Sequence, residues 1–232
     1  MLIPAAGKGT RSNLPYPKTL LKINRKTILE RIINKVDFLD KSPSIIVSNK
    51  GINLIHNYLK TKRINSELIL QNRIKGMGNA ILQFQKSKYF NKSDHILLIW
   101  GDIPFIRKSS IKKLINFHKK NENSMTILSA YTKNPYTYIS RDRKGKIIEI
   151  IETKNIKKVF NYGERDIGVF IFDKKLIFRY LKRKYKEKYS PNNEHNFLYI
   201  IKYLAKSNYK IESLPIANKK EMKSLNYLKD LN

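Results

Sequence analysis

The first half of the chain alternates short apolar segments with amphipathic helical segments, and this alternation constrains the fold more than any other feature. Such an order is typical of a parallel sheet covered by helices. The predicted strands are residues 2–6, Ser44–Ser48, Glu67–Leu70 and His95–Trp100. The predicted helices are Thr27–Phe38, Ile52–Lys60, Gly78–Lys86 and Ser109–Lys120.

From Ser124 the pattern changes to closely spaced strand segments. These are residues 124–131, 136–140, 146–152 and 166–172, with a hairpin turn around Gly145. Two helices, Lys174–Tyr185 and Asn196–Ala205, and a last strand over residues 210–216 follow. The sequence therefore predicts an α/β fold with an antiparallel β insertion, and a length of 232 residues favours a single domain.

The net charge of +30 comes from 48 basic and 18 acidic residues. The lysines are spread along the chain, and no zinc-finger, RNP-type or helix-turn-helix pattern accompanies them, so we expect solvated surfaces and no specific nucleic-acid partner. The absence of cysteine excludes disulfides and thiol nucleophiles, and the four histidines lack metal-ligand spacing. Without a segment of roughly 20 apolar residues we expect a cytoplasmic protein that does not span a membrane.

The opening segment AAGKGTR, residues 5–11, follows the first apolar run and precedes Pro17-Lys18. Gly7 and Gly9 allow backbone N–H groups to approach a phosphate closely. The segment is not a P-loop, because Leu2 stands where that motif needs its first glycine. It is not a dinucleotide fingerprint either, because Ser12 replaces the third glycine.

Two further motifs follow strands of the predicted sheet. Gln71 precedes a glycine pair, Gly76 and Gly78, and a glutamine amide can read the edge of a base. Asp102 lies in a Gly-Asp-Ile-Pro segment directly after a buried strand. A carboxylate at the end of a parallel strand is suited to hold Mg²⁺, which prefers oxygen ligands.

Together these motifs resemble those of nucleotidyltransferases that make sugar nucleotides, and they are closest to bacterial N-acetylglucosamine-1-phosphate uridylyltransferases. The resemblance runs from Leu2 to Leu231. It implies a Rossmann-like nucleotidyltransferase fold with a nucleotide-binding half near residues 1–123 and a sugar-binding half near residues 124–232. The implied reaction is Mg²⁺-dependent transfer of a nucleotidyl group from a nucleoside triphosphate, with UTP favoured, to a sugar 1-phosphate, which releases pyrophosphate.

The same resemblance assigns residues to roles. Catalysis would use Arg11 and Lys18, and the metal ligands would be Asp102 and Asn226, with Asn218 as a rival for Asn226. The nucleotide would meet Ala5, Ala6, Gly7, Lys8, Gly9, Thr10, Gln71, Gly76 and Met77. The sugar would meet Glu152, Asp166 and Gly168.

Departures from the family pattern leave alternatives open. Asp166 and Ile167 stand where the family has asparagine and threonine, which leaves the sugar undefined. The first strand is expected to be short, and the acetyltransferase activity of the fused family members is not predicted. A cytidylyl- or guanylyltransferase acting on a non-sugar phosphate, a basic nucleic-acid-binding protein and an inactive regulator all remain possible, and the oligomeric state is open.

Overall fold

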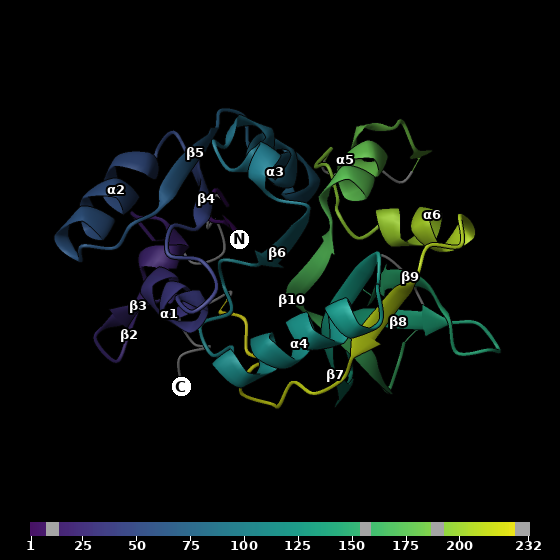
Figure 1. Ribbon diagram of the computed structural model, residues 1–232. Helices are drawn as coiled ribbons and strands as arrows, with labels where there is room; N and C mark the ends of the chain where they lie inside the picture. Colours follow the sequence, from purple (N-terminus) through teal and green to yellow (C-terminus); the bar gives the residue numbers. More distant parts are fainter. Residues whose placement is uncertain (8–13, 154–158, 187–192, 226–232) are drawn as a thin grey trace.

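A seven-stranded sheet forms the centre of the protein in the computed structural model, which describes residues 1–7, 14–153, 159–186 and 193–225 (Figure 1). Its strands, in spatial order, are β11 (Ile211–Leu214), β7 (Met125–Lys133), β10 (Tyr162–Asp173), β6 (His95–Ile99), β1 (Leu2–Pro4), β4 (Ser44–Ser48) and β5 (Glu67–Gln71). The first strand of the chain thus lies inside the sheet.

The sheet is mostly parallel, as the sequence predicted. Strands β6, β1, β4 and β5 run parallel to one another, whereas β10 runs antiparallel to both β6 and β7. The hairpin of β8 (Thr137–Arg141) and β9 (Ile147–Glu152) forms a separate two-stranded sheet beside this antiparallel region. The predicted α/β class with antiparallel strands in its second half is therefore confirmed.

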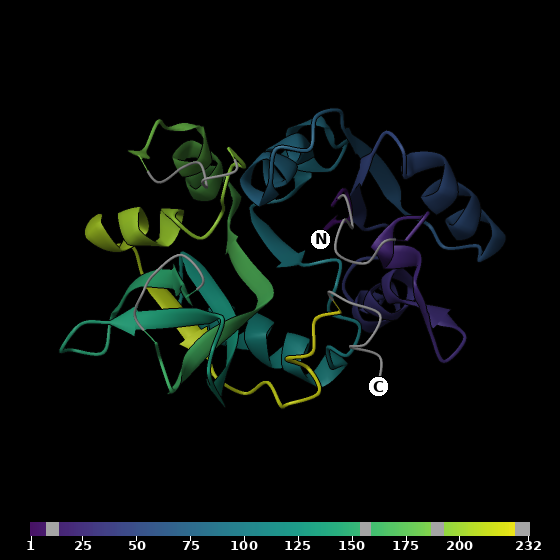
Figure 2. The same ribbon diagram turned by 180° about the vertical axis from the view of Figure 1, so that it is seen from behind.

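Helices cover both faces of the sheet (Figures 1 and 2). One apolar core packs α1 (Ile28–Val36), α2 (Ile52–Thr61) and α4 (Lys108–Lys120) on one face. The other packs α3 (Met77–Gln83), α5 (Lys174–Lys182) and α6 (Ile200–Lys206) on the opposite face. The shorter elements are η1 (Lys18–Leu20), β2 (Lys22–Ile23), β3 (Lys26–Thr27), η2 (Phe84–Lys86) and η3 (Phe90–Lys92).

Local sequence explains where the helices begin. The hydroxyl of Thr27 accepts a hydrogen bond from the Glu30 N–H, and the carboxylate of Asp173 accepts one from Leu176. Such caps satisfy N–H groups that have no partner inside the helix. In α1 the apolar residues recur every three to four positions and are buried against the sheet.

Two predicted boundaries were wrong for identifiable reasons. The helix predicted from Asn196 begins at Ile200, because the Asn196 side chain accepts hydrogen bonds from the N–H groups of Phe197 and Leu198 and holds a turn there. Strand β10 begins at Tyr162, before the predicted start at Asp166, because its polar first residues pair with β7. Their polarity gave no apolar strand signal.

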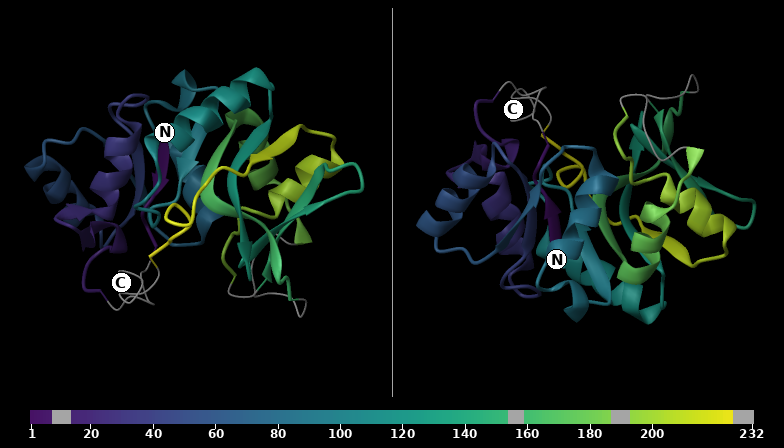
Figure 3. Two further views of the ribbon diagram at one scale, coloured as in Figure 1. Left: turned by 90° about the horizontal axis from the view of Figure 1, so that it is seen from below. Right: turned by 90° about the horizontal axis from the view of Figure 1, so that it is seen from above.

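The two halves of the chain meet at β1, β6 and β10. In both views of Figure 3 the N-terminal strand lies between the purple and blue elements and the green and yellow elements. Strand β6 pairs with β1 on one side and with β10 on the other. Residues from both halves therefore approach the ends of these central strands.

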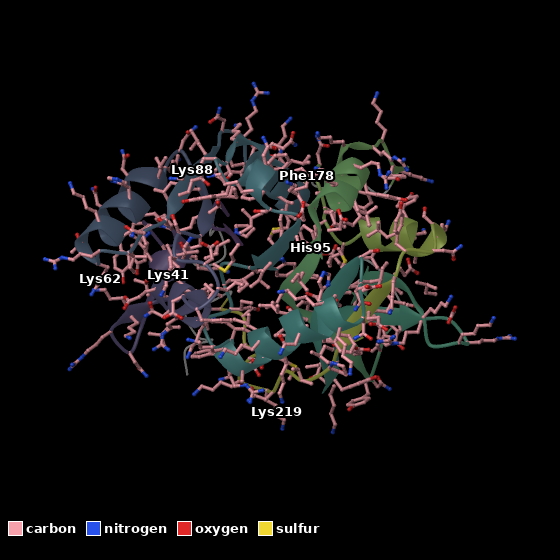
Figure 4. All side chains as sticks on the ribbon, viewed as in Figure 1. Lys41, Lys62, Lys88, His95, Phe178 and Lys219 are labelled. Carbon is pink, nitrogen blue, oxygen red and sulfur yellow. The ribbon has the colours of Figure 1, made fainter. Side chains whose placement is uncertain are left out.

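Basic side chains are distributed around the molecule. Figure 4 labels Lys41, Lys62, Lys88 and Lys219 over different parts of the molecule, and blue nitrogen atoms end many side chains around its outline. This distribution matches the spread of lysines along the sequence. Within the described residues, no helix has the length and apolar character needed to cross a bilayer.

A pair of histidines forms a partly buried polar contact at the start of β6, away from the carboxyl ends of the central strands. The Nε2 atom of His118, in the last turn of α4, lies 3.0 Å from Nδ1 of His95, and its Nδ1 lies 2.8 Å from the Thr126 hydroxyl. His118 is 2% exposed. Burial and the neighbouring His95 lower the pKa of His118 to about 4.

This shift predicts an acid-dependent loss of stability. A histidine whose pKa is lowered on folding contributes stability above its unfolded pKa of 6.5, and that stability is lost as the pH falls toward 4. Between pH 7.5 and pH 5 we expect His118 to account for at most about 2 kcal/mol of the lost free energy of unfolding. Urea unfolding at both pH values measures this loss.

The matched variants are His118→Gln and His56→Gln, because His56 is exposed on α2. The His118 variant should lose less stability between the two pH values than the wild type, while the His56 variant should follow the wild type. The same pH dependence in all three proteins would contradict the assignment to His118.

Candidate active site

A cavity of about 470 Å³ opens at the carboxyl ends of the parallel strands. Strands β1, β5 and β6 run in one direction, so the residues that follow or end them gather at one edge of the sheet, where ligands bind in open α/β sheets. The lining residues are Pro4, Ala5, Ala6, Gly7, Lys18, Thr19, Gln71, Ile74, Gly76, Met77, Ala80, Trp100, Gly101, Asp102 and Glu194.

The cavity brings together most of the predicted site residues that the structure describes. Ala5, Ala6 and Gly7 follow β1, and Lys18 begins the short helix η1. Gln71 ends β5, Gly76 and Met77 lie at the start of α3, and Asp102 follows β6. The predicted residues Lys8, Gly9, Thr10 and Arg11 lie outside the described residues.

Asp102 and Lys18 form an ion pair in the cavity. The Lys18 ammonium lies 3.1 Å from Oδ2 of Asp102, and both side chains are about one-fifth exposed. The second oxygen, Oδ1, is buried and has no hydrogen-bond partner. A buried carboxylate oxygen without a partner is costly unless a cation or donor meets it, so this atom fits a hard divalent cation.

Other acidic residues do not complete a metal centre within the described part of the chain. No group of three or more histidine or acidic side chains with metal-binding geometry occurs there. A metal at Asp102 would thus need further oxygen ligands from elsewhere, such as phosphate, water or the predicted asparagine.

The C-terminal segment runs to Asp102. Leu225 donates its backbone N–H to the Asp102 carbonyl at 3.0 Å, and the next residue, Asn226, lies outside the described residues. Its rival Asn218 accepts a hydrogen bond from the Glu221 N–H at 3.0 Å. The Glu221 carboxylate forms an ion pair with Arg107. The Asn218 side chain is therefore used in the turn that fixes Glu221.

The glycine pair allows a close approach between α3 and the loop that contains His195. Gly78 donates its N–H to the His195 carbonyl, and His195 donates its own N–H to the Lys75 carbonyl. Gly76 has a φ of +87°, which favours glycine. A Cβ added to Gly78 would lie 2.4 Å from the Asn196 carbonyl oxygen, so the backbones could not keep this spacing.

The predicted sugar residues occupy different positions around the cavity. Glu152 ends β9 and accepts a hydrogen bond of 3.3 Å from the Asn196 amide. The backbone carbonyl of Gly168 accepts a hydrogen bond from the backbone N–H of Trp100, and Gly168 lies against the Trp100 ring. Neither Glu152 nor Gly168 lines the cavity itself.

Asp166 lies beneath the cavity wall and is fully buried. Its carboxylate accepts hydrogen bonds from the Thr137 hydroxyl at 2.6 Å and from the Gly168 N–H at 2.9 Å. Burial raises the pKa of Asp166 above its ordinary value. A direct contact with a sugar would require these hydrogen bonds to be exchanged, whereas in the structure they shape the bulge in β10.

Sequence reasoning missed several residues of the cavity. Trp100, the last residue of a predicted strand, packs against Phe170 but also lines the cavity, and its indole N–H is buried without a partner. Thr19 and Glu194 line the cavity as well. Glu194 lies in residues 188–196, where a proline and several asparagines indicate only a loop, so nothing in the sequence indicated its position.

This cavity has the parts of a nucleotidyltransferase site: a glycine-containing loop, a lysine, an amide and an acidic residue at the ends of parallel strands. Residues 1–167 match the family model described as a MobA-like NTP transferase domain. The chain therefore belongs to the MobA-like NTP transferase family, and the predicted resemblance to nucleotidyltransferases is confirmed.

Among curated proteins, the bifunctional protein GlmU of Buchnera aphidicola from Schizaphis graminum is 36% identical over 97% of this chain. The same protein of Buchnera aphidicola from Baizongia pistaciae is 32% identical over 100% of the chain. The chain spans about half the length of these curated relatives, 48% and 50% respectively.

Among solved structures, a UDP-glucose pyrophosphorylase complexed with UDP-glucose matches with a TM-score of 0.78 and 20% identity. That match covers 99% of this chain and 94% of the other. The inositol-1-phosphate CTP transferase from T. maritima matches with a TM-score of 0.75 and 15% identity, and covers 100% of this chain and 90% of the other. These likenesses confirm the Rossmann-like nucleotidyltransferase fold.

The contact around Gly78 generates a prediction about the α3 side of the cavity. Gly78→Ala should lower the free energy of unfolding by about 2 kcal/mol through overpacking. It should also weaken nucleoside triphosphate binding by about tenfold, because α3 must move away from the His195 loop. Urea unfolding and calorimetric titration of the triphosphate measure the two effects.

Gly145→Ala is the matched control, because Gly145 also needs glycine, with a φ of +80°, but lies in the distant β8–β9 turn with open space around it. It should lose about 1 kcal/mol of stability and bind the triphosphate normally. Equal losses of binding in both variants would show that the close approach at Gly78 does not organise the site.

Proposed function

We propose that this chain transfers a uridylyl group from UTP to a sugar 1-phosphate and releases pyrophosphate. The observation that carries the proposal is the convergence of residues 5–7, Lys18, Gln71 and Asp102 in one cavity. Membership of a nucleotidyltransferase family supports the reaction class. The motif resemblance to N-acetylglucosamine-1-phosphate uridylyltransferases supports UTP and a sugar 1-phosphate as substrates.

The reaction needs positioning and charge neutralisation more than a covalent nucleophile. A phosphate oxygen of the acceptor attacks the α-phosphorus of the triphosphate, and a P–O bond forms. The bond between the α-phosphorus and the oxygen that bridges it to the β-phosphorus breaks, and pyrophosphate leaves with the electron pair of that bond. The acceptor phosphate is already anionic, so the attack requires no general base.

Lys18 is the catalytic cation proposed among the described residues. Lys18 lines the cavity and its ammonium lies 3.1 Å from Asp102, where it can neutralise charge on the α-phosphate and the incoming phosphate. Arg11, which belongs to the opening motif, is proposed to hold the departing phosphates with its planar guanidinium. Backbone N–H groups of the loop from Ala5 to Thr10 would hold the triphosphate.

Nucleotidyltransferases of this family generally use a divalent metal ion. We propose Mg²⁺ held by Asp102, whose buried Oδ1 has no hydrogen-bond partner, and by Asn226. When bound, the ion would neutralise phosphate charge as a Lewis acid. Asn226 is favoured over Asn218, because Leu225 bonds to Asp102 while the Asn218 side chain is used in its own turn.

The acceptor is proposed to lie between the Trp100 side of the cavity and β9. Glu152 would accept hydrogen bonds from sugar hydroxyls, and its contact with Asn196 holds it near the loop that carries Glu194. Gly168 would allow close approach beside Trp100. Asp166 would support this wall through Thr137 and Gly168 and would not bind the sugar directly.

Removal of the Asp102 charge should abolish the reaction without unfolding the protein. Asp102→Asn should lower kcat/KM for pyrophosphate release by at least about 100-fold, because the metal loses its charged ligand. Coupled detection of pyrophosphate measures the loss. Asp37→Asn, an exposed carboxylate of an ion pair with Lys108, is the matched control and should keep full activity. Full activity of the Asp102 variant would remove Asp102 from the mechanism.

Glu152 should affect the acceptor and not the triphosphate. Glu152→Gln keeps the size of the side chain but weakens hydrogen bonds from hydroxyl donors, so KM for the acceptor should rise by about tenfold. The KM for the triphosphate should stay within about twofold of the wild type. Initial rates with each substrate varied in turn measure both constants. A rise in the KM for the triphosphate alone would contradict the assignment of Glu152 to the acceptor.

The substrate pair is identified by pyrophosphate release with Mg²⁺ across UTP, CTP, dTTP, GTP and ATP. Each is tested against sugar 1-phosphates and alcohol phosphates. Turnover with UTP and one sugar 1-phosphate would support the proposal, and turnover only with an alcohol phosphate would favour the non-sugar alternative. No turnover by a folded protein, together with tight and salt-dependent RNA or DNA binding, would favour the binding-protein alternative.

A further inference from the structure

The two ends of the Gln71 side-chain amide are used differently. Its Nε2 atom donates to Oδ1 of Asn79 at 2.8 Å and lies 3.4 Å from the Gly76 carbonyl oxygen. No hydrogen bond to its Oε1 atom occurs within the described residues. Gln71 is only 2% exposed, yet it lines the 470 Å³ cavity and a neighbouring cavity of about 580 Å³.

The surroundings of Gln71 fix which end of its amide is bound within the protein and which end is left for a ligand. A backbone carbonyl can only accept hydrogen bonds, so the atom beside the Gly76 oxygen must be the amide nitrogen. Rotating the amide would bring two oxygen atoms together at that point. Asn79 reinforces the same orientation by offering its own oxygen to the nitrogen.

The position of Asn79 follows from helix geometry. Gly76 is the N-cap of α3, and Asn79 follows three residues later in the first turn, so the Gly76 carbonyl and the Asn79 side chain both reach Gln71 at the end of β5. The Asn79 carbonyl also accepts a hydrogen bond from Gln83, which is four residues later on α3. The half-buried Asn79 side chain lies in the first turn of α3, where its oxygen accepts the hydrogen bond from Gln71.

We propose that Asn79 is a specificity-determining positioning residue, which makes Gln71 present an oxygen, and not an amino group, to the base of the triphosphate. Such a site accepts bases that carry a ring N–H on their pairing edge, which are uracil, thymine and guanine. On the same edge, cytosine and adenine carry a ring nitrogen that accepts hydrogen bonds. This nitrogen would face the Gln71 oxygen, which is also an acceptor, so no hydrogen bond could form. The inference rests on the proposed function, because it assigns the base end of that cavity.

The opposite orientation of the Gln71 amide shows why the residue at position 79 matters. Without the Asn79 oxygen, only the longer 3.4 Å contact with the Gly76 carbonyl holds Nε2. The Gln71 amide can then rotate at lower cost and offer its amino group to an acceptor, so the site tolerates cytosine better. A buried polar contact of fixed polarity discriminates strongly, because the wrong ligand leaves polar groups unpaired. Asn79 therefore acts on the choice of base through Gln71.

The test compares binding of UTP and CTP, measured by calorimetry without acceptor, in the wild type and three variants. The wild type should bind UTP at least about tenfold more tightly than CTP. Asn79→Ala should reduce this preference to about threefold or less by weakening UTP and improving CTP. Asn79→Asp keeps an oxygen for Nε2 and should retain the preference.

Gln83→Ala is the matched control, because it removes an amide hydrogen bond on the same helix that ends at the Asn79 backbone and does not reach Gln71. It should leave the ratio of UTP to CTP binding unchanged. Turnover with each triphosphate, in the presence of the preferred sugar 1-phosphate, should follow the same ratios.

Three results would overturn the inference: tighter binding of CTP than of UTP by the wild type, an equal loss of both nucleotides in Asn79→Ala, or loss of the preference in Asn79→Asp. The proposed function fails in a different way, through the absence of any triphosphate binding or turnover by the wild type. A preference for GTP over UTP would contradict the proposed uridylyl donor but agree with the polarity assigned to Gln71.

Discussion

The parallel pairing of β1 with both β4 and β6 is the constraint on which the rest of the structure depends. It brings the loop after β1 beside the segment after β6, and it aligns both with the end of β5. Chain segments that are distant in sequence therefore meet at one edge of the sheet. Lys18 and Asp102, separated by 84 positions, form an ion pair there.

The antiparallel strand β10 connects this edge to the second half of the chain. Its bulge, where the register shifts between Asp166 and Val169, is held by the Thr137 and Gly168 hydrogen bonds. Gly168 in turn accepts a hydrogen bond from Trp100, two residues before Asp102. A contiguous chain of contacts thus runs from the β8 hairpin to the proposed metal ligand, and the two halves hold one cavity between them.

Much of this arrangement could be predicted because its signals are local. The alternation of apolar runs with amphipathic helices identified the sheet, and the residues after three of its strands identified Gly7, Gln71 and Asp102. The contributions of Glu194, His195 and Asn196 could not be predicted, because they depend on a loop that returns from the second half to the α3 glycines. The burial of Asp166 was also hidden, since only the fold reveals its partner Thr137.

The central claim is that Asp102 holds a divalent metal together with the triphosphate. Electron paramagnetic resonance of Mn²⁺, in the presence of a UTP analogue that cannot be cleaved between its α- and β-phosphates, tests it without turnover. The account predicts Mn²⁺ binding that the analogue strengthens and that Asp102→Asn weakens by at least about tenfold in a folded protein. Equal Mn²⁺ affinity in the wild type and the variant would contradict the assignment of Asp102 to the metal.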